Sequence, residues 1–82
     1  MAVDHRKALE LAREGQWHAS HEIVQVGSDD FSSLIHAYLH RVEGDVSNAA
    51  YWYQRAGEPV CSLSVEQELE NLFEREANNR RD

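Results

Sequence analysis

An internal repeat limits the folds open to this chain of 82 residues more than any other feature. A shift of 29 positions places Gly15 on Gly44 and keeps small residues in register on both sides of each glycine. Small residues at fixed positions allow two helices to approach closely, while large aromatic residues fill the space between helix pairs. The repeat therefore predicts two similar helical hairpins. The matching pairs are Ala8 with Ala37, Glu14 with Glu43, Ser20 with Ala49, Ile23 with Trp52, Val24 with Tyr53, and Gly27 with Ala56.

Apolar residues recur with helical periodicity along the whole chain, and no segment alternates as a strand does. Helix stops are expected at four glycines, and Ser64 with Gln67 has the spacing of a capping box that begins a last helix. We therefore predict one all-α domain over residues 1–82. It comprises two antiparallel helical hairpins, over 4–27 and 30–57, and a C-terminal capping helix over 64–78. The expected stops are Gly15, Gly27, Gly44 and Gly57.

The second hairpin resembles the second half of a tetratricopeptide repeat in Gly44, Asp45, Ala49, Tyr53, Ala56 and Pro59. The first hairpin resembles it more loosely in Gly15, Trp17, Ser20 and Val24. The chain departs from the tetratricopeptide pattern in two ways. Its repeat period of 29 residues is shorter than the usual period of about 34 residues, and Pro59 comes earlier in the repeat than the proline of that family does. Segment 36–53 also resembles a group of small bacterial proteins of unassigned function. The tetratricopeptide resemblance implies a scaffold that binds peptides or proteins, usually in a groove lined by the first helix of each hairpin.

The charge and the cysteine content narrow the functional classes. A net charge of -7 argues against nucleic acid as a partner, because phosphate binding requires clustered Lys and Arg. No apolar run reaches the length that spans a membrane, and the N-terminus has no signal-peptide pattern. Cys61 is the single cysteine, so no internal disulfide can form, which favours a reducing cytoplasm.

Three polar residues of the third predicted helix form the sharpest candidate site. His36, His40 and Glu43 fall on one narrow stripe, since the spacings of four and three residues follow the helical turn. Two imidazoles at this spacing can share Zn²⁺, with the carboxylate as a third ligand. Ala37 stands where a zinc peptidase carries its catalytic glutamate, so that chemistry is not indicated. A structural or surface role is favoured, with metal binding and peptide contact left open.

The other histidines are expected to have simpler roles. His18 and His21 lie three residues apart on the second predicted helix, where His18 faces solvent, and the pair is interpreted as having a structural or surface role. His5 falls on the apolar face of the first helix and is expected to pack against neighbouring side chains.

A second polar stripe lies on the fourth predicted helix. Asn48, Tyr51 and Arg55 lie opposite its apolar face, and the forked guanidinium of Arg55 suits a carboxylate. This stripe could receive the acidic terminus of a partner. The favoured alternative is pairing of Arg55 within the chain. The candidates for that pairing are Glu43, Asp45 and Glu58. Trp52 lies at the margin of the apolar face, where it could reach a neighbouring molecule.

The sequence thus predicts a cytoplasmic, acidic, non-enzymatic helical-repeat module without a cofactor or bound metal. Its partner is expected to be a protein or peptide, or a second copy of the chain, since two hairpins are few for a stable stack. The predicted binding surface comprises His36, His40, Glu43, Asn48, Tyr51 and Arg55. The alternative function is a small metal-binding or metal-dependent catalytic protein that uses the first three of these residues. A purely structural homodimer is a third possibility.

Overall fold

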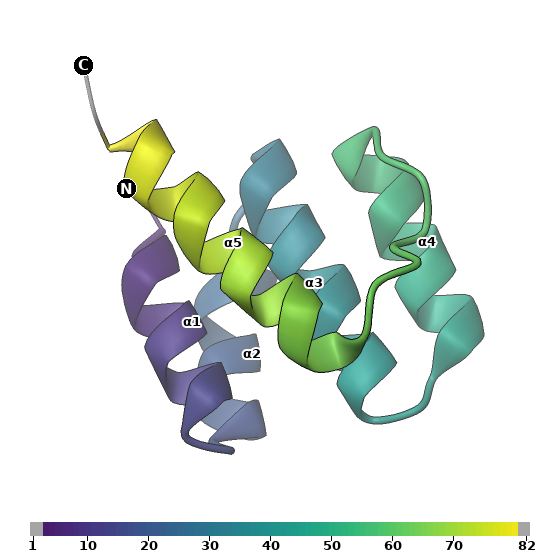
Figure 1. Ribbon diagram of the computed structural model, residues 1–82, viewed down its shortest axis with the longest axis horizontal. Coiled ribbons are helices and arrows are strands. Elements are labelled where there is room, and N and C mark those ends of the chain that lie inside the picture. Colours follow the sequence, from purple (N-terminus) through teal and green to yellow (C-terminus); the bar gives the residue numbers. More distant parts are fainter. Residues whose placement is uncertain (1–2, 81–82) are drawn as a thin grey trace.

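The structure is a computed structural model that describes residues 3–80, and within that range it contains five α-helices and no strand. The helices are α1 (His5–Arg13), α2 (Trp17–Gln25), α3 (Asp30–Val42), α4 (Val46–Ala56) and α5 (Val65–Asn79) (Figure 1). The all-α class is therefore confirmed. The helix ends differ from the predicted ends by one or two residues, as is usual where helices fray.

The turns that follow α1 and α3 have the same backbone hydrogen bonds, as the repeat predicts. Gly15 and Gly44 adopt φ values of 79° and 88°, a left-handed conformation that glycine accepts without steric penalty. In both turns the second residue after the helix cap donates back across the turn, which is the Schellman arrangement. The two bonds are Gln16 N–H to Leu11 O and Asp45 N–H to His40 O, each 2.9 Å long.

Gly27 serves a different purpose from the one expected of it. Helix α2 already ends at Gln25, and φ at Gly27 is not positive. A Cβ atom at this position would lie 2.4 Å from Ser32 Oγ and 2.7 Å from a methyl carbon of Val3. The α2–α3 connection thus requires glycine because other side chains lie against its backbone, and not because the turn is left-handed.

Helix α3 is the central element of the fold, since it packs against each of the other four helices. Every residue from Ser32 to His40 is buried. Two valines beside the α3–α4 turn are not part of this core: Val46 is 72% exposed and Val42 is 47% exposed. The buried apolar core comprises Ala8, Leu9, Val24, Leu34, Ile35, Ala37, Tyr38, Leu39, Ala49, Tyr53, Ala56 and Leu72.

Helix α5 crosses in front of the two hairpins and packs along α1 and α3 (Figure 1). Helices α1 and α3 are the first helices of the two hairpins. From the tetratricopeptide resemblance, these helices are expected to line a peptide-binding groove. A capping box at Ser64 and Gln67 starts α5, as the sequence predicts. The face that could have received a peptide is therefore covered by the chain's own last helix.

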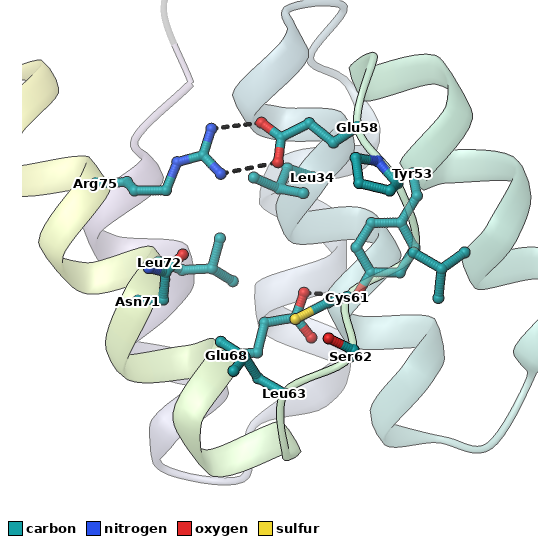
Figure 2. Close-up of a pocket in the computed structure, with 12 residues that line it drawn as sticks. Leu34, Tyr53, Glu58, Cys61, Ser62, Leu63, Glu68, Asn71, Leu72 and Arg75 are labelled. Atoms are coloured by element: carbon teal, nitrogen blue, oxygen red, sulfur yellow. Dashed lines mark hydrogen bonds and ion pairs between the residues drawn. The ribbon is translucent and has the colours of Figure 1, made fainter.

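Ion pairs attach α5 to the second hairpin. Glu68 of α5 accepts hydrogen bonds from Tyr53 and Arg41, at 2.5 and 2.8 Å. Arg75 donates to both carboxylate oxygens of Glu58, at 2.9 and 2.5 Å (Figure 2). Tyr53, Glu58, Glu68 and Arg75 line the pocket in Figure 2, and each charged group among them is already paired within the chain, so the pocket is assigned no ligand. None of the helices described is long and apolar enough to cross a membrane.

Candidate functional site

The centre of the candidate site is His36, in the middle of α3. Its side chain is directed towards α2 and α4, and the residue is only 5% exposed. The imidazole stacks on the indole of Trp52 from α4, with ring centroids 3.9 Å apart and an angle of 12° between the planes. An imidazole held in this way has little rotational freedom, so its ring nitrogens have defined positions.

Two further imidazoles meet His36. The Nε2 atom of His21, from α2, lies 3.0 Å from Nε2 of His36. The ring of His40, one turn along α3, stacks beside His36 at a centroid distance of 4.9 Å. Each of the three residues offers one ring nitrogen such that all three nitrogens lie within 4.8 Å of one another. The two hairpins thus bring three imidazoles together, and we call these residues the histidine cluster.

A second tryptophan supports the opposite side of the histidine cluster. Trp17, one helical turn before His21 on α2, stacks on its imidazole with centroids 4.7 Å apart and planes 11° apart. The indole N–H of Trp17 donates to the carbonyl of Leu39 at 2.6 Å, which ties α2 to α3. Because its only polar hydrogen is used in this bond, Trp17 has a fixed orientation.

Glu43 contacts the histidine cluster through one member only. Its carboxylate accepts a hydrogen bond from Nδ1 of His40 at 2.5 Å. With the proton of a neutral His40 on Nδ1, its Nε2 atom carries a lone pair. Glu43 is itself exposed, whereas His40 is 7% exposed. The sequence correctly places these two residues on one stripe, but the carboxylate orients the ring of His40 from outside the cluster.

Burial disfavours the charged forms of His36 and His21. It lowers the pKa of His36 from 6.5 to about 4, with smaller contributions from His21 and His40, so His36 is neutral at pH 7. Burial, and then the charge of His40, also lowers the pKa of His21. Among the described residues, no group hydrogen-bonds Nδ1 of His36, although this atom is buried. An unpaired buried polar atom of this kind costs about 1–3 kcal/mol.

His21 is the member of the cluster that the sequence interpretation missed. The sequence predicts only a structural or surface role for His18 and His21, and of the two only His18 is exposed. The sequence feature that could have placed His21 in the interior is its spacing from Trp17, because residues four apart lie on one face of a helix. Since Trp17 was expected in the interior, the same face should have carried His21 inward. His5 is packed as expected, edge-on to the Phe31 ring.

The predicted binding surface separates into two parts in the structure. His36 and His40 are buried in the histidine cluster, whereas Tyr51 and Arg55 are exposed on α4 and Asn48 is half-buried at its start. These two groups do not form one continuous surface. Asn48 contributes to the helix cap, because its backbone N–H and its side-chain amide both donate to Asp45 at 3.3 Å.

Arg55 is not paired within the chain in the way the sequence interpretation favoured. Its guanidinium lies over the rings of Trp52 and Tyr51, at 5.2 and 6.0 Å from their centroids. Its one hydrogen bond in the described structure goes to the hydroxyl of Tyr51, at 3.3 Å. The three expected carboxylates have other partners: Glu43 binds His40, Asp45 caps α4 and Glu58 binds Arg75.

No known protein family, curated protein or solved structure matches this chain. Its function is therefore argued from the geometry of its own residues.

Proposed function

We propose that this chain is a non-enzymatic, tetratricopeptide-like interaction module that binds a protein partner through the outer face of α4. The observation that carries the proposal is the group formed by exposed Tyr51 and Arg55 and partly buried Trp52, in which the guanidinium lies over both rings. Tyr, Trp and Arg are the residues that most often dominate the binding energy of protein interfaces. Stacking on the rings holds the guanidinium in place before a partner arrives, which reduces the entropy lost on binding.

The charge of α4 favours an acidic partner segment. The chain contains 15 acidic residues, yet α4 contains none, and Arg55 is its only charged residue. No carboxylate among the described residues pairs with Arg55. A carboxylate from another molecule can therefore bind the guanidinium in a bidentate manner without displacing an existing ion pair.

The position of α4 also supports this surface over the usual groove. Helix α4 lies at the edge of the bundle and packs along α3 (Figure 1). Helix α5 packs against α1 and α3, the helices that would line the peptide groove of a tetratricopeptide-like module. A partner on the outer face of α4 needs no rearrangement of the fold. We place this module in the cytoplasm, where the free thiol of Cys61 stays reduced.

Affinity capture from the native lysate tests the proposal when three forms of the chain are compared. We expect Arg55→Ala to lose the partner that the wild type retains. The matched control is Lys7→Ala, which removes an equal charge from an exposed position on α1. Equal capture by all three forms contradicts the proposal. If the partner is a second copy, sedimentation of the purified wild type gives twice the monomer mass of 9.4 kDa, and Arg55→Ala returns the monomer.

A further inference from the structure

We propose that His21, His36 and His40 form a binding site for one divalent transition-metal ion, with Zn²⁺ as the best fit. The site shares Trp52 with the α4 surface, but its three ligands come from α2 and α3 and none of them belongs to that surface. It combines one ligand from the first hairpin with two from the second, so a bound ion would link the two hairpins through its coordination bonds.

The distances within the cluster are close to those that a metal requires. At metal–nitrogen bond lengths of about 2.0–2.1 Å, a tetrahedral ion separates two ligand nitrogens by about 3.3 Å. The Nε2 atoms of His21 and His36 are 3.0 Å apart, and the ligand atoms of all three residues lie within 4.8 Å of one another. Small side-chain rotations are enough to equalise these distances around one ion.

Glu43 supplies the outer support that metal-bound histidines normally have. Such a histidine donates its remaining ring N–H to a carboxylate, carbonyl or water, which fixes the ring and strengthens the ligand. In this chain Nδ1 of His40 donates to Glu43, so Nε2 is the nitrogen left for the ion. We therefore assign Glu43 as a positioning residue, in place of the third ligand that the sequence suggested.

Two tryptophans hold the ligands in place before an ion arrives. Trp17 stacks on His21 and Trp52 stacks on His36, each with nearly parallel rings. Stacking restricts ring rotation, so less entropy is lost when the nitrogens coordinate an ion. His21 is only half-buried, which leaves one side of the cluster accessible to an entering ion and to a water as fourth ligand.

Packing alone explains the cluster poorly. An apolar residue at position 36 would fill the space against Trp52 without burying polar ring nitrogens. With His40 neutral and its Nδ1–H bonded to Glu43, the three imidazoles have three ring lone pairs and only two other N–H groups. A cation accepts those lone pairs, and Zn²⁺, Cu²⁺ and Ni²⁺ are the ions that imidazole ligands favour. Zn²⁺ is the best fit because three histidines with an open fourth position form a typical zinc arrangement.

Calorimetric titration of the full, metal-free chain with zinc chloride tests the site. We expect one-to-one binding that is lost in His21→Gln and retained in His18→Gln. His18 lies on the same helix but is exposed, so it is a matched control. His21 is chosen for substitution because it is half-buried, and circular dichroism of each variant checks that it folds. Glu43→Gln should weaken zinc binding by about 10–100-fold, as expected when an outer support is lost.

A second measurement reports the ligands directly. Titration with Co²⁺ should produce the strong visible absorption of a tetrahedral ion in the wild type and in His18→Gln, and not in His21→Gln. The proposal is overturned if the wild type binds neither ion, if His21→Gln binds like the wild type, or if His18→Gln loses binding as well.

Discussion

The hydroxyl of Tyr53 on α4 donates a hydrogen bond of 2.5 Å to the carboxylate of Glu68 on α5. Both residues are almost fully buried, at 1% and 3% exposure. The second carboxylate oxygen accepts from Arg41, so the charge of Glu68 is neutralised inside the protein. This contact joins the edge helix of the second hairpin to the helix that crosses both hairpins.

Replacing Tyr53 with Phe should lower the free energy of unfolding by about 1.5–3 kcal/mol, because a buried hydrogen bond to a charged group is lost. The ring remains in place, so the loss reports the hydroxyl. Chemical denaturation measures it, with Tyr51→Phe on the exposed side of the same helix as the control. Equal stability of the wild type and Tyr53→Phe would mean that water replaces the hydroxyl beside Glu68.

Stability should also fall at alkaline pH for a reason specific to Tyr53. Burial raises its pKa well above the ordinary value of 10.0, and the hydrogen bond to Glu68 and the charges of Glu68 and Cys61 raise it further, against a smaller opposing effect of Arg41. Above pH 10 the unfolded chain releases the phenol proton while the folded chain retains it, so the free energy of unfolding decreases as the pH rises.

Melting temperatures measured between pH 9 and pH 11.5 test this expectation. The wild type should lose stability more steeply than Tyr53→Phe above pH 10. Tyr38 has a pKa raised by burial as well, so the variant should keep part of the decrease. If the melting temperatures of the wild type and Tyr53→Phe fall equally with pH, the phenol of Tyr53 has the same pKa in the folded and the unfolded chain.

Replacing Ala49 with Leu should cost about 1–3 kcal/mol of stability, because Ala49 is buried and the three additional carbons of leucine force its neighbours apart. Ala49 is buried on α4 at the position that matches buried Ser20 on α2. Thermal unfolding measures the effect, with Gln54→Leu at an exposed position of α4 as the control. An unchanged melting temperature for Ala49→Leu would show that the α3–α4 crossing has spare volume.

Substitution of Gly27 should destabilise the fold through a steric clash. Its Cβ would overlap Ser32 Oγ, whose bonds to Asp29 and His5 hold it in place. Gly27→Ala should therefore lower the melting temperature by several degrees, since about 1 kcal/mol shifts it by 4–8 °C in a domain of this size. The backbone at Gly27 is not left-handed, so alanine causes no backbone strain there and the variant tests the steric clash alone. A melting temperature equal to that of the wild type would mean that the α2–α3 connection shifts enough to accommodate the added methyl group.

The sequence by itself determined the features that depend on neighbours along the chain. The helical periodicity, the left-handed glycines Gly15 and Gly44, and the capping box at Ser64 each involve residues within about five positions of one another. Their geometry is therefore set before any helix packs. The match of Gly15 with Gly44 in the 29-residue repeat is also a local feature, because the turns after α1 and α3 form the same backbone hydrogen bonds.

Only the tertiary structure decided which faces meet. Periodicity gives the direction of a side chain around its own helix axis, but it does not say which other helix lies in that direction. The contact of His21 with His36 therefore depends on how α2 packs against α3, and Arg55 lacks the carboxylate of Glu58 because that group binds Arg75 of α5. The histidine cluster joins residues 15 positions apart from two hairpins, and α5 covers helices far from it in the chain. Such contacts depend on how five helices share one core, and that arrangement is fixed by the packing of the whole chain.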